Sequence, residues 1–247
     1  HIISDGTSLG IFFQSLMNYY DGIQSPVSYV QYKDYAAWQQ NMIHSELLEK
    51  QEQFWLSQFD DEIPVLNLPT DFKRPQIQSF EGDTARFVFV NSSREKAVNL
   101  AKSNHTTLNV VMLSVINILL SKLSNQQDIV VGMPISGRVN QQIDTVLGMF
   151  VNTLAIRNKL SADSSFTEFL NEVKINLFKA YDNQNYQFED LVDKLAIKRD
   201  ASRNPVFDVM FQMQNEEFTM PLFECQRNIS KFDLTITVRE EGDDLHM

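Results

Sequence analysis

Apolar residues recur every three or four positions in several long segments of the chain and alternate with polar residues in others. The first segment predicts a helix over residues 8–19, because its apolar side chains share one helical face: Leu9, Phe12, Phe13, Leu16 and Tyr20. Asp5 or Ser8 would cap this helix. A longer pattern predicts one amphipathic helix over residues 31–59.

Residues 63–82 contain three prolines and little periodicity, which predicts an extended surface connector between two lobes. Beyond it the patterns predict a strand at 83–90, helices at 93–104 and 106–124, a buried strand at 128–137, a loop and strand at 144–160, helices at 164–184 and 188–197, and strands at 205–215 and 232–242. The last two strands follow each other without a helix between them. This order is typical of a mixed-sheet α/β or α+β fold.

The composition narrows the class of protein. The chain has 247 residues, 43% of them hydrophobic, and a formal charge of −11. It lacks the clustered Lys and Arg that bind nucleic acid, and no apolar run reaches the roughly 20 residues of a membrane helix. Cys225 is the single cysteine, which excludes an internal disulfide and fits a reducing compartment. We expect a cytoplasmic globular protein without a signal peptide, and a chain that is a piece of a longer polypeptide.

Isolated chemical motifs are scarce. His1 and Asp5 lie four positions apart, but the other histidines, at 44, 105 and 246, stand in separate segments, so we predict no metal site. The chain has no G-x-S-x-G elbow of a serine hydrolase and too few glycines for a phosphate-binding loop. From spacing alone, His1 is either a functional group or a frayed terminal residue, and Asp5 is either its partner or a helix cap.

Seven motifs in a fixed order carry a resemblance to a known family. The segment "HIISDG" resembles the latter part of the H-H-x-x-x-D-G motif of condensation domains from nonribosomal peptide synthetases, with His1 at the second histidine. The other motifs that match are "YKDYAAW" (32–38), "RPQIQSFEG" (74–82), "DIVVGMPISGR" (128–138), "LGMFVNTLAIR" (147–157), "NQNYQFEDLVDKL" (183–195) and "RDASRNPVFDVMFQMQN" (199–215).

The resemblance implies a fold similar to chloramphenicol acetyltransferase, built as two lobes with a tunnel between them. Each lobe would be a mixed-sheet α/β two-layer sandwich. On this layout residues 1–70 are the C-terminal part of the first lobe and carry the His-x-x-x-Asp-Gly motif. Residues 71–83 are the connector, and residues 84–247 are the second lobe, incomplete at its end. The first histidine of the motif would precede His1.

The resemblance also implies a reaction, peptide-bond formation in antibiotic or lipopeptide biosynthesis. The α-amine of an acceptor aminoacyl thioester attacks the carbonyl of a donor aminoacyl or peptidyl thioester, and both are carried on phosphopantetheine arms. We expect as partners the donor and acceptor peptidyl carrier domains that supply these arms, with an adjacent adenylation domain in the same polypeptide. No cofactor is expected on this chain itself. His1 is the expected catalytic residue, as general base or as a positioner of the amine.

Three residues are implied to support the active site. Asp5 is expected to pair with Arg138 beneath the site and to hold the loop in shape, in preference to transferring a proton. For Arg138 the alternative is a solvated arginine in a turn. Gly6 would leave room for the pantetheine arm, and an ordinary turn glycine is the alternative.

Ser136, Asn152 and Asn204 lie in matching motifs and are candidates for the tunnel wall. For the two asparagines, a satisfied core or cap amide is the alternative. Trp38 and its neighbouring aromatic residues are predicted to lie in the core, because they stand at helical spacing; substrate binding is the alternative.

Two rival functions stay open. An epimerisation domain shares the fold and the histidine motif but needs a second acid or base. A non-catalytic condensation-like module would dock carrier proteins or recruit a partner enzyme. The segments "GMFVNTL" and "SRNPVFDVMFQMQN" favour condensation domains that join an L-configured donor to an L-configured acceptor. The family pattern has His or Asp and Pro where this chain has Asn183, Asn185 and Gln187, which weakens any contact inferred from those positions.

Overall fold

The computed structural model describes residues 2–24, 29–198, 200–214 and 228–247. The helices in these ranges are α1 (Gly6–Tyr20), α2 (Tyr32–Met42), α3 (Glu46–Ser57), α4 (Asn91–Ser103), α5 (Leu108–Ser124), α6 (Phe166–Asp182) and α7 (Phe188–Leu195), with the 3-10 turn η1 (Gln141–Ile143). The strands are β1 (Val88–Phe89), β2 (Asp128–Ile135), β3 (Asn152–Lys159), β4 (Val209–Gln214), β5 (Leu234–Glu241) and β6 (Asp244–His246). Cys225 lies outside the described residues.

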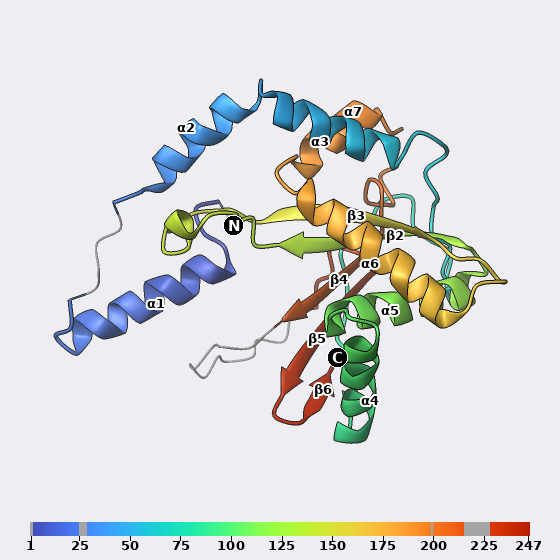
Figure 1. The fold of residues 1–247 in the computed structure, drawn as a ribbon. Helices are drawn as coiled ribbons and strands as arrows, with labels where there is room; N and C mark the ends of the chain where they lie inside the picture. Colours follow the sequence, from blue (N-terminus) through green and yellow to red (C-terminus); the bar gives the residue numbers. More distant parts are fainter. Residues whose placement is uncertain (1, 25–28, 199, 215–227) are drawn as a thin grey trace.

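One six-stranded sheet with the order β1-β6-β5-β4-β2-β3 forms the centre of the structure (Figure 1). β2 pairs antiparallel with β3 and parallel with β4, and β4 pairs parallel with β5. β6 is antiparallel to both β5 and β1. Helices α4, α5 and α6 contact one another in series and contact β6, β2 and β3. They therefore form one layer on the sheet, which confirms the predicted mixed-sheet α/β class.

Helix α5 fills the space between this helical layer and the sheet. Four of its apolar side chains are at most 1% exposed: Val110, Leu113, Ile116 and Leu120. Its buried polar residues are satisfied within the helix, since the Ser114 hydroxyl donates to the Val110 carbonyl and the Asn117 amide donates to the Leu113 carbonyl. Burial of each such apolar side chain contributes roughly 1.5–3 kcal/mol, so α5 anchors the sheet on which the site is built.

Within the described residues, no single helix has the length and apolar composition to cross a membrane. Helices α4 and α5 have that length and composition only when they are taken as a pair, and the pair is bent by 108° at its junction.

The helix predicted over residues 31–59 is instead two helices, α2 and α3. Ser45 stands at the break, where its hydroxyl donates to the Met42 carbonyl at 2.7 Å and accepts from the Leu48 amide at 3.2 Å. A serine that satisfies the end of one helix and the start of the next favours a boundary over a continuous helix. Helix α2 contains no buried residue, and the prediction that Trp38 lies in the core is wrong, because this side chain is 42% exposed.

The sheet edge also differs from the prediction. The strand expected over residues 83–90 is limited to β1, a pair of residues, and the sequence analysis did not predict β6. β6 follows Gly242, whose φ of 59° permits the tight turn after β5. A three-residue strand is too short to leave an alternating pattern in the sequence.

Arg157, on β3, ties the segment after α3 to the edge of the sheet. Its guanidinium group pairs with Asp128 at 2.6 Å and with Asp61 at 2.5 Å. It also donates to the backbone carbonyls of Gln58 and Glu62, at 2.9 and 3.0 Å. The arginine side chain is only 5% exposed. One buried cation therefore holds residues 58–62 against two strands.

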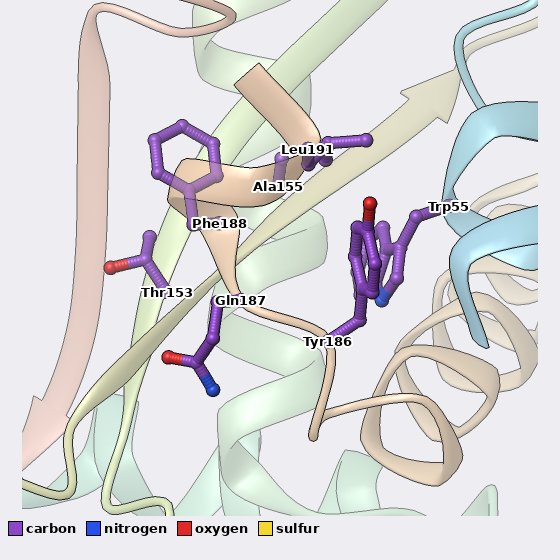
Figure 2. A pocket seen from close by; sticks show the side chains of 7 residues that line it. All are labelled: Trp55, Thr153, Ala155, Tyr186, Gln187, Phe188 and Leu191. Atoms are coloured by element: carbon purple, nitrogen blue, oxygen red, sulfur yellow. The ribbon is translucent and has the colours of Figure 1, made fainter. Parts of the chain in front are cut away.

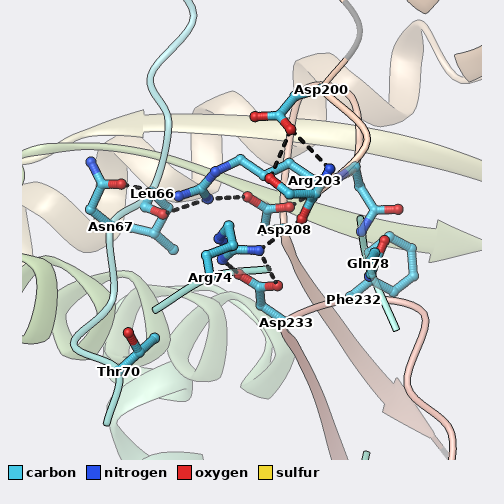
Figure 3. Close-up of polar contacts among 12 residues, drawn as sticks. Leu66, Asn67, Thr70, Arg74, Gln78, Asp200, Arg203, Asp208, Phe232 and Asp233 are labelled. Carbon is cyan, nitrogen blue, oxygen red and sulfur yellow. Dashed lines mark hydrogen bonds and ion pairs between the residues drawn. The ribbon is translucent and has the colours of Figure 1, made fainter. Parts of the chain in front are cut away.

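Two further arginines hold the connector and the loop before β4 (Figure 3). Arg74 forms an ion pair with Asp233, the residue before β5. Arg203 pairs with Asp208 at 2.6 Å and donates to the carbonyl of Leu66 at 3.1 Å. Residues 71–83 contain only an isolated bridge, and every described strand lies beyond them. The division into two lobes at this connector stays a prediction.

The Arg157 cluster yields a stability prediction. Lysine at position 157 keeps the charge but cannot reproduce the planar fork of donors, so carbonyl acceptors lose their partner. We expect Arg157→Lys to lower the free energy of unfolding of the complete domain by about 2–4 kcal/mol, measured by urea unfolding. Lys159 shares the same two aspartates but is 60% exposed, so Lys159→Ala should change the free energy by less than about 0.5 kcal/mol. Equal losses in the two variants would contradict the assignment.

Candidate active site

Asp5 begins helix α1 as its N-cap and is 1% exposed. One carboxylate oxygen accepts from the Ser8 amide at 2.7 Å, and the other accepts from the Phe150 amide at 3.1 Å. Nη2 of Arg138 lies 3.2 and 3.4 Å from the two oxygens. A single carboxylate thus joins the start of α1, the backbone two residues before β3, and the loop after β2.

Arg138 is as enclosed as Asp5, with 4% of its side chain exposed. Its Nη1 donates to the carbonyls of Ile143 and Val146, at 2.5 and 2.9 Å. The guanidinium carbon lies 4.2 Å from the centroid of the Phe150 ring, which is a cation–π contact. Among the described residues Nε has no hydrogen-bond partner. The arginine therefore shapes the loop between β2 and β3 while it neutralises Asp5, and the structure brings the two predicted partners together.

Ser8 completes this buried cluster, and the sequence analysis considered it only as a cap. Its hydroxyl donates to the Gly148 carbonyl at 2.7 Å and accepts from the Gly148 amide at 3.0 Å. Arg138 donates to the same hydroxyl at 2.9 Å. The signal in the sequence was its position three residues after Asp5, where a side chain points back toward the cap.

The protonation of Asp5 follows from these contacts. Burial by itself would raise the pKa of this carboxyl group. Hydrogen bonds from Ser8 and from the Phe150 amide, together with the charge of Arg138, outweigh burial and hold the pKa below its ordinary value of 3.8. Asp5 is therefore a carboxylate at neutral pH and is poorly suited to accept a catalytic proton.

Two glycines allow the loop after β2 to approach its neighbours closely. Gly137 has φ of 64°, and a Cβ atom there would lie 1.8 Å from the carbonyl oxygen of Phe150. A Cβ atom at Gly148 would lie 2.0 Å from the ring of Tyr32, whose hydroxyl donates to the Met149 carbonyl at 2.8 Å. The loop thus packs against α1 on one side and against the aromatic residues of α2 on the other.

The remaining predicted site residues differ in their surroundings. His1 lies outside the described residues. Gly6 opens α1, and a Cβ atom there would meet no described atom within 4 Å. Ser136 is exposed, and its hydroxyl accepts from the Arg138 amide at 3.5 Å. Asn204 is half-buried and donates to the Lys231 carbonyl at 2.9 Å, so it joins the loop before β4 to the segment before β5.

Asn152 is a buried amide with all its hydrogen-bonding groups satisfied. This favours a role as a core amide over a role in lining a tunnel. Its Nδ2 donates to the carbonyls of Gln184 and Tyr186 at 2.9 and 2.8 Å. Its Oδ1 accepts from the amides of Thr153 and Phe188 at 2.8 and 3.2 Å. Because both donors and both acceptor positions are used, Asn152 anchors the loop between α6 and α7 and has no group left to face a tunnel.

The same loop is held from the other side by α3, which the sequence analysis did not foresee. Gln51 accepts from the amides of Asn185 and Tyr186, at 3.0 and 3.1 Å. Trp55 Nε1 donates to the Asn183 carbonyl at 2.8 Å. Figure 2 shows Trp55 and Tyr186 among the side chains around the start of α7. The α6–α7 loop is therefore fixed between α3 and β3.

A cavity of about 240 Å³ lies between α2, the start of α3 and the α6–α7 segment. Helix α2 contributes Tyr35, Trp38, Gln39, Gln40 and Met42, and Ile43 and Leu48 follow; Asn185, Gln187 and Asp190 form the opposite wall. The Tyr35 ring also lies 4.7 Å from the Phe150 ring, between centroids. The Phe150 ring thus contacts both Tyr35, which lines the cavity, and Arg138 of the buried cluster. Within the described ranges, no group of three or more His, Cys, Asp or Glu residues could hold a metal ion.

Comparisons with known proteins agree over the whole chain. A family model described as "Condensation domain" matches residues 1–247. Tyrocidine synthase 3 of Brevibacillus parabrevis is 45% identical over 253 residues, which cover 99% of this chain and 4% of that protein. Surfactin synthase subunit 1 of Bacillus subtilis (strain 168) is 45% identical over 248 residues, 97% of this chain and 7% of that protein. The chain thus spans less than a tenth of these curated relatives.

Solved structures show the same fold. A four-domain nonribosomal peptide synthetase bound to AMP and glycine superposes with a TM-score of 0.88 and 25% identity, covering 98% of this chain and 20% of that one. The X-domain from teicoplanin biosynthesis, in its complex with OxyB, superposes with a TM-score of 0.86 at 23% identity, covering 99% of this chain and 60% of that one. This second likeness bears on the fold alone.

The buried pair yields a second prediction. Asp5→Asn leaves the Arg138 charge uncompensated, and we expect the free energy of unfolding of the complete domain to fall by about 3–5 kcal/mol at pH 7. The pKa of Asp5 is lower in the folded protein than its value of 3.8 in the unfolded chain, so the ionised carboxylate stabilises the folded state at higher pH. This stabilisation is lost as the pH falls through the folded-state pKa. The difference between wild type and Asp5→Asn should therefore shrink as pH falls from about 5 to about 3.

Urea unfolding at several pH values measures both effects. Asp144→Asn is the matched control, since this exposed residue lies in the loop that Arg138 holds and the substitution removes the same charge. A cost for Asp144→Asn equal to that of Asp5→Asn, or a difference that does not depend on pH, would refute the role given to the pair.

Proposed function

Because the chain belongs to the condensation-domain family, we propose that it catalyses amide-bond formation in nonribosomal peptide synthesis. The observation that carries the proposal is the intact His-x-x-x-Asp-Gly segment, in which Asp5 is held by the buried Arg138. Relatives at 45% identity are synthetases of tyrocidine and surfactin, which agrees with this activity. We also propose that the domain joins a donor of L configuration to an acceptor of L configuration.

The reaction joins two thioesters. The α-amine of the acceptor attacks the thioester carbonyl of the donor, a C–N bond forms, and a tetrahedral intermediate collapses as the C–S bond breaks. The amine loses one proton and the departing thiolate gains one. A free α-amine has a pKa near 8, so it is mostly protonated at pH 7, but removing that proton to give the nucleophilic amine costs only about 1.4 kcal/mol. Holding two tethered substrates in contact is therefore the main contribution of the protein.

His1 is the proposed catalytic residue, as general base toward the amine or as the group that positions it. Asp5 lies four residues later, and its four contacts hold the start of α1 in one conformation. These contacts fix the helix start that the motif histidine precedes in the sequence, which supports a positional role for Asp5. The open space beside Gly6 is compatible with passage of the pantetheine arm. Asp5 and Arg138 act through position and do not touch the reacting atoms.

The proposed partners follow from the substrates. Phosphopantetheine arms come from donor and acceptor peptidyl carrier domains, with an adenylation domain in the same polypeptide. The relatives are large synthetases of which this chain spans 4% to 7%, and the superposed synthetase has four domains. We include cytoplasmic localisation in the proposal.

Two other functions compete with condensation. An epimerisation domain would remove an α-proton from a bound aminoacyl group. A non-catalytic module would dock a protein, and the X-domain that this fold resembles was solved in complex with OxyB. The higher identity to the synthetases, 45% against 23%, favours the catalytic role.

The first test concerns His1. In the complete domain, mixed with donor and acceptor carrier proteins loaded with defined L-aminoacyl groups, we expect His1→Ala to slow formation of the dipeptidyl thioester by about 100-fold or more. Mass spectrometry detects this product. His44→Ala is the control, because His44 is exposed and outside the motif. Near-normal turnover in His1→Ala would remove the catalytic assignment.

The second test separates condensation from epimerisation. The complete domain is incubated in D₂O with a loaded donor carrier and no acceptor, and the aminoacyl group is released and analysed by mass and chirality. We expect no deuterium at the α-carbon and no D-isomer, because condensation leaves the Cα–H bond intact. Deuterium incorporation that depends on His1 would favour an epimerisation domain.

A further inference from the structure

The cavity between α2 and the α6–α7 segment has a negatively charged lining. Its lining, which is given above, has aromatic and apolar groups with two glutamine amides along α2, and two further amides and one carboxylate from the α6–α7 segment. Asp190 is the charged residue of this lining, and no cation stands among the lining residues that the structure describes.

The surroundings of Asp190 add to the negative charge. Partial removal from water and the charges of Glu189, Asp193 and Glu52 raise the pKa of Asp190, while the charge of Lys194 lowers it. Lys194 is already paired with Glu52 at 3.1 Å. The carboxylate therefore stands in a negative potential that a cation in the cavity would relieve.

The opposite wall suits the same type of group. The Tyr35 and Trp38 rings lie 5.6 Å apart between centroids, with a tilt of 32° between their planes. Aromatic faces at such a spacing contact both the methylene stem and the charged head of an alkyl cation. Nε2 of Gln187 donates one hydrogen bond to the backbone carbonyl of Asn185 at 3.1 Å. Among the described residues the hydrogen bonds of Asn185 run through its backbone, so its side-chain Oδ1 can accept from an ammonium group.

We propose that this cavity binds an alkylammonium group, with Asp190 as the countercharge, Tyr35 and Trp38 against the stem, and the Asn185 amide oxygen as a further acceptor. The volume of about 240 Å³ lies below the usual range for drug-sized ligands, about 300–1,000 Å³, and fits one amino-acid side chain.

The binding is tested without turnover. The complete domain, labelled with ¹⁵N at its Asn and Gln side chains, is titrated with n-pentylammonium chloride and, separately, with 1-pentanol, which has the same stem without the charge. We expect the side-chain amide signals of Asn185 and Gln187 to shift with pentylammonium and to stay in place with pentanol. Equal shifts with the two probes would overturn the proposal.

Two matched variants locate the countercharge. Asp190→Asn should weaken pentylammonium binding about threefold, as expected for a largely exposed ion pair. Glu189→Gln removes the same charge from the adjacent position of α7, outside the cavity lining, and should change the dissociation constant much less. Equal weakening in the two variants would show a diffuse field in place of a site and would overturn the proposal. Undisturbed signals from the remaining side-chain amides show that each variant is folded.

A second arm identifies the source of the cation, and this arm alone rests on the proposed function. Acceptor and donor carriers are loaded with ornithine or with norleucine, which has a neutral side chain of the same length. If the side chain of a substrate occupies the cavity, wild type should prefer ornithine in KM, and Asp190→Asn should reduce that preference about threefold. Binding of pentylammonium without this preference assigns the site to a free amine.

Discussion

The buried contact between Asp5 and Arg138 is the constraint on which the candidate site depends. Asp5 is the cap of α1, and Arg138 holds three carbonyls of the loop that leads to β3. A charge that is removed from water needs a partner and hydrogen bonds for all its oxygens, and both are present here. The start of α1 therefore cannot move independently of the loop.

Three polar side chains perform a similar task for the loop between α6 and α7. The α6–α7 loop has few backbone partners of its own, and Gln51, Trp55 and Asn152 supply hydrogen bonds to its peptide groups. A buried peptide group without a partner costs about 1–3 kcal/mol, so these three residues allow an irregular loop to be enclosed. The loop in turn positions Asn185 and Asp190 beside the cavity, opposite the aromatic residues of α2.

Regular elements were largely predictable because their signals are local. Helices α4, α5 and α6 follow from apolar residues at helical spacing, and β2 and β5 follow from buried or alternating runs. The helix break at Ser45 was missed, because the apolar spacing continues across it while one hydroxyl decides the boundary. Short β6 was missed because three residues carry no period. Trp38 was misplaced, since helical spacing identifies a face of α2 but not whether another element covers it.

The sequence by itself determined the mixed α/β class, the family and the identity of the motif that begins at His1, because these depend on residue types in a fixed order along the chain. It also named Asp5 and Arg138 as partners through the family resemblance. Only the tertiary structure decided that Ser8 joins this pair, that Asn152 uses its whole amide to hold a loop, and that Asp190 faces aromatic rings across a cavity. These contacts join residues more than 30 positions apart in sequence, and such distances are set by packing, which no local pattern records.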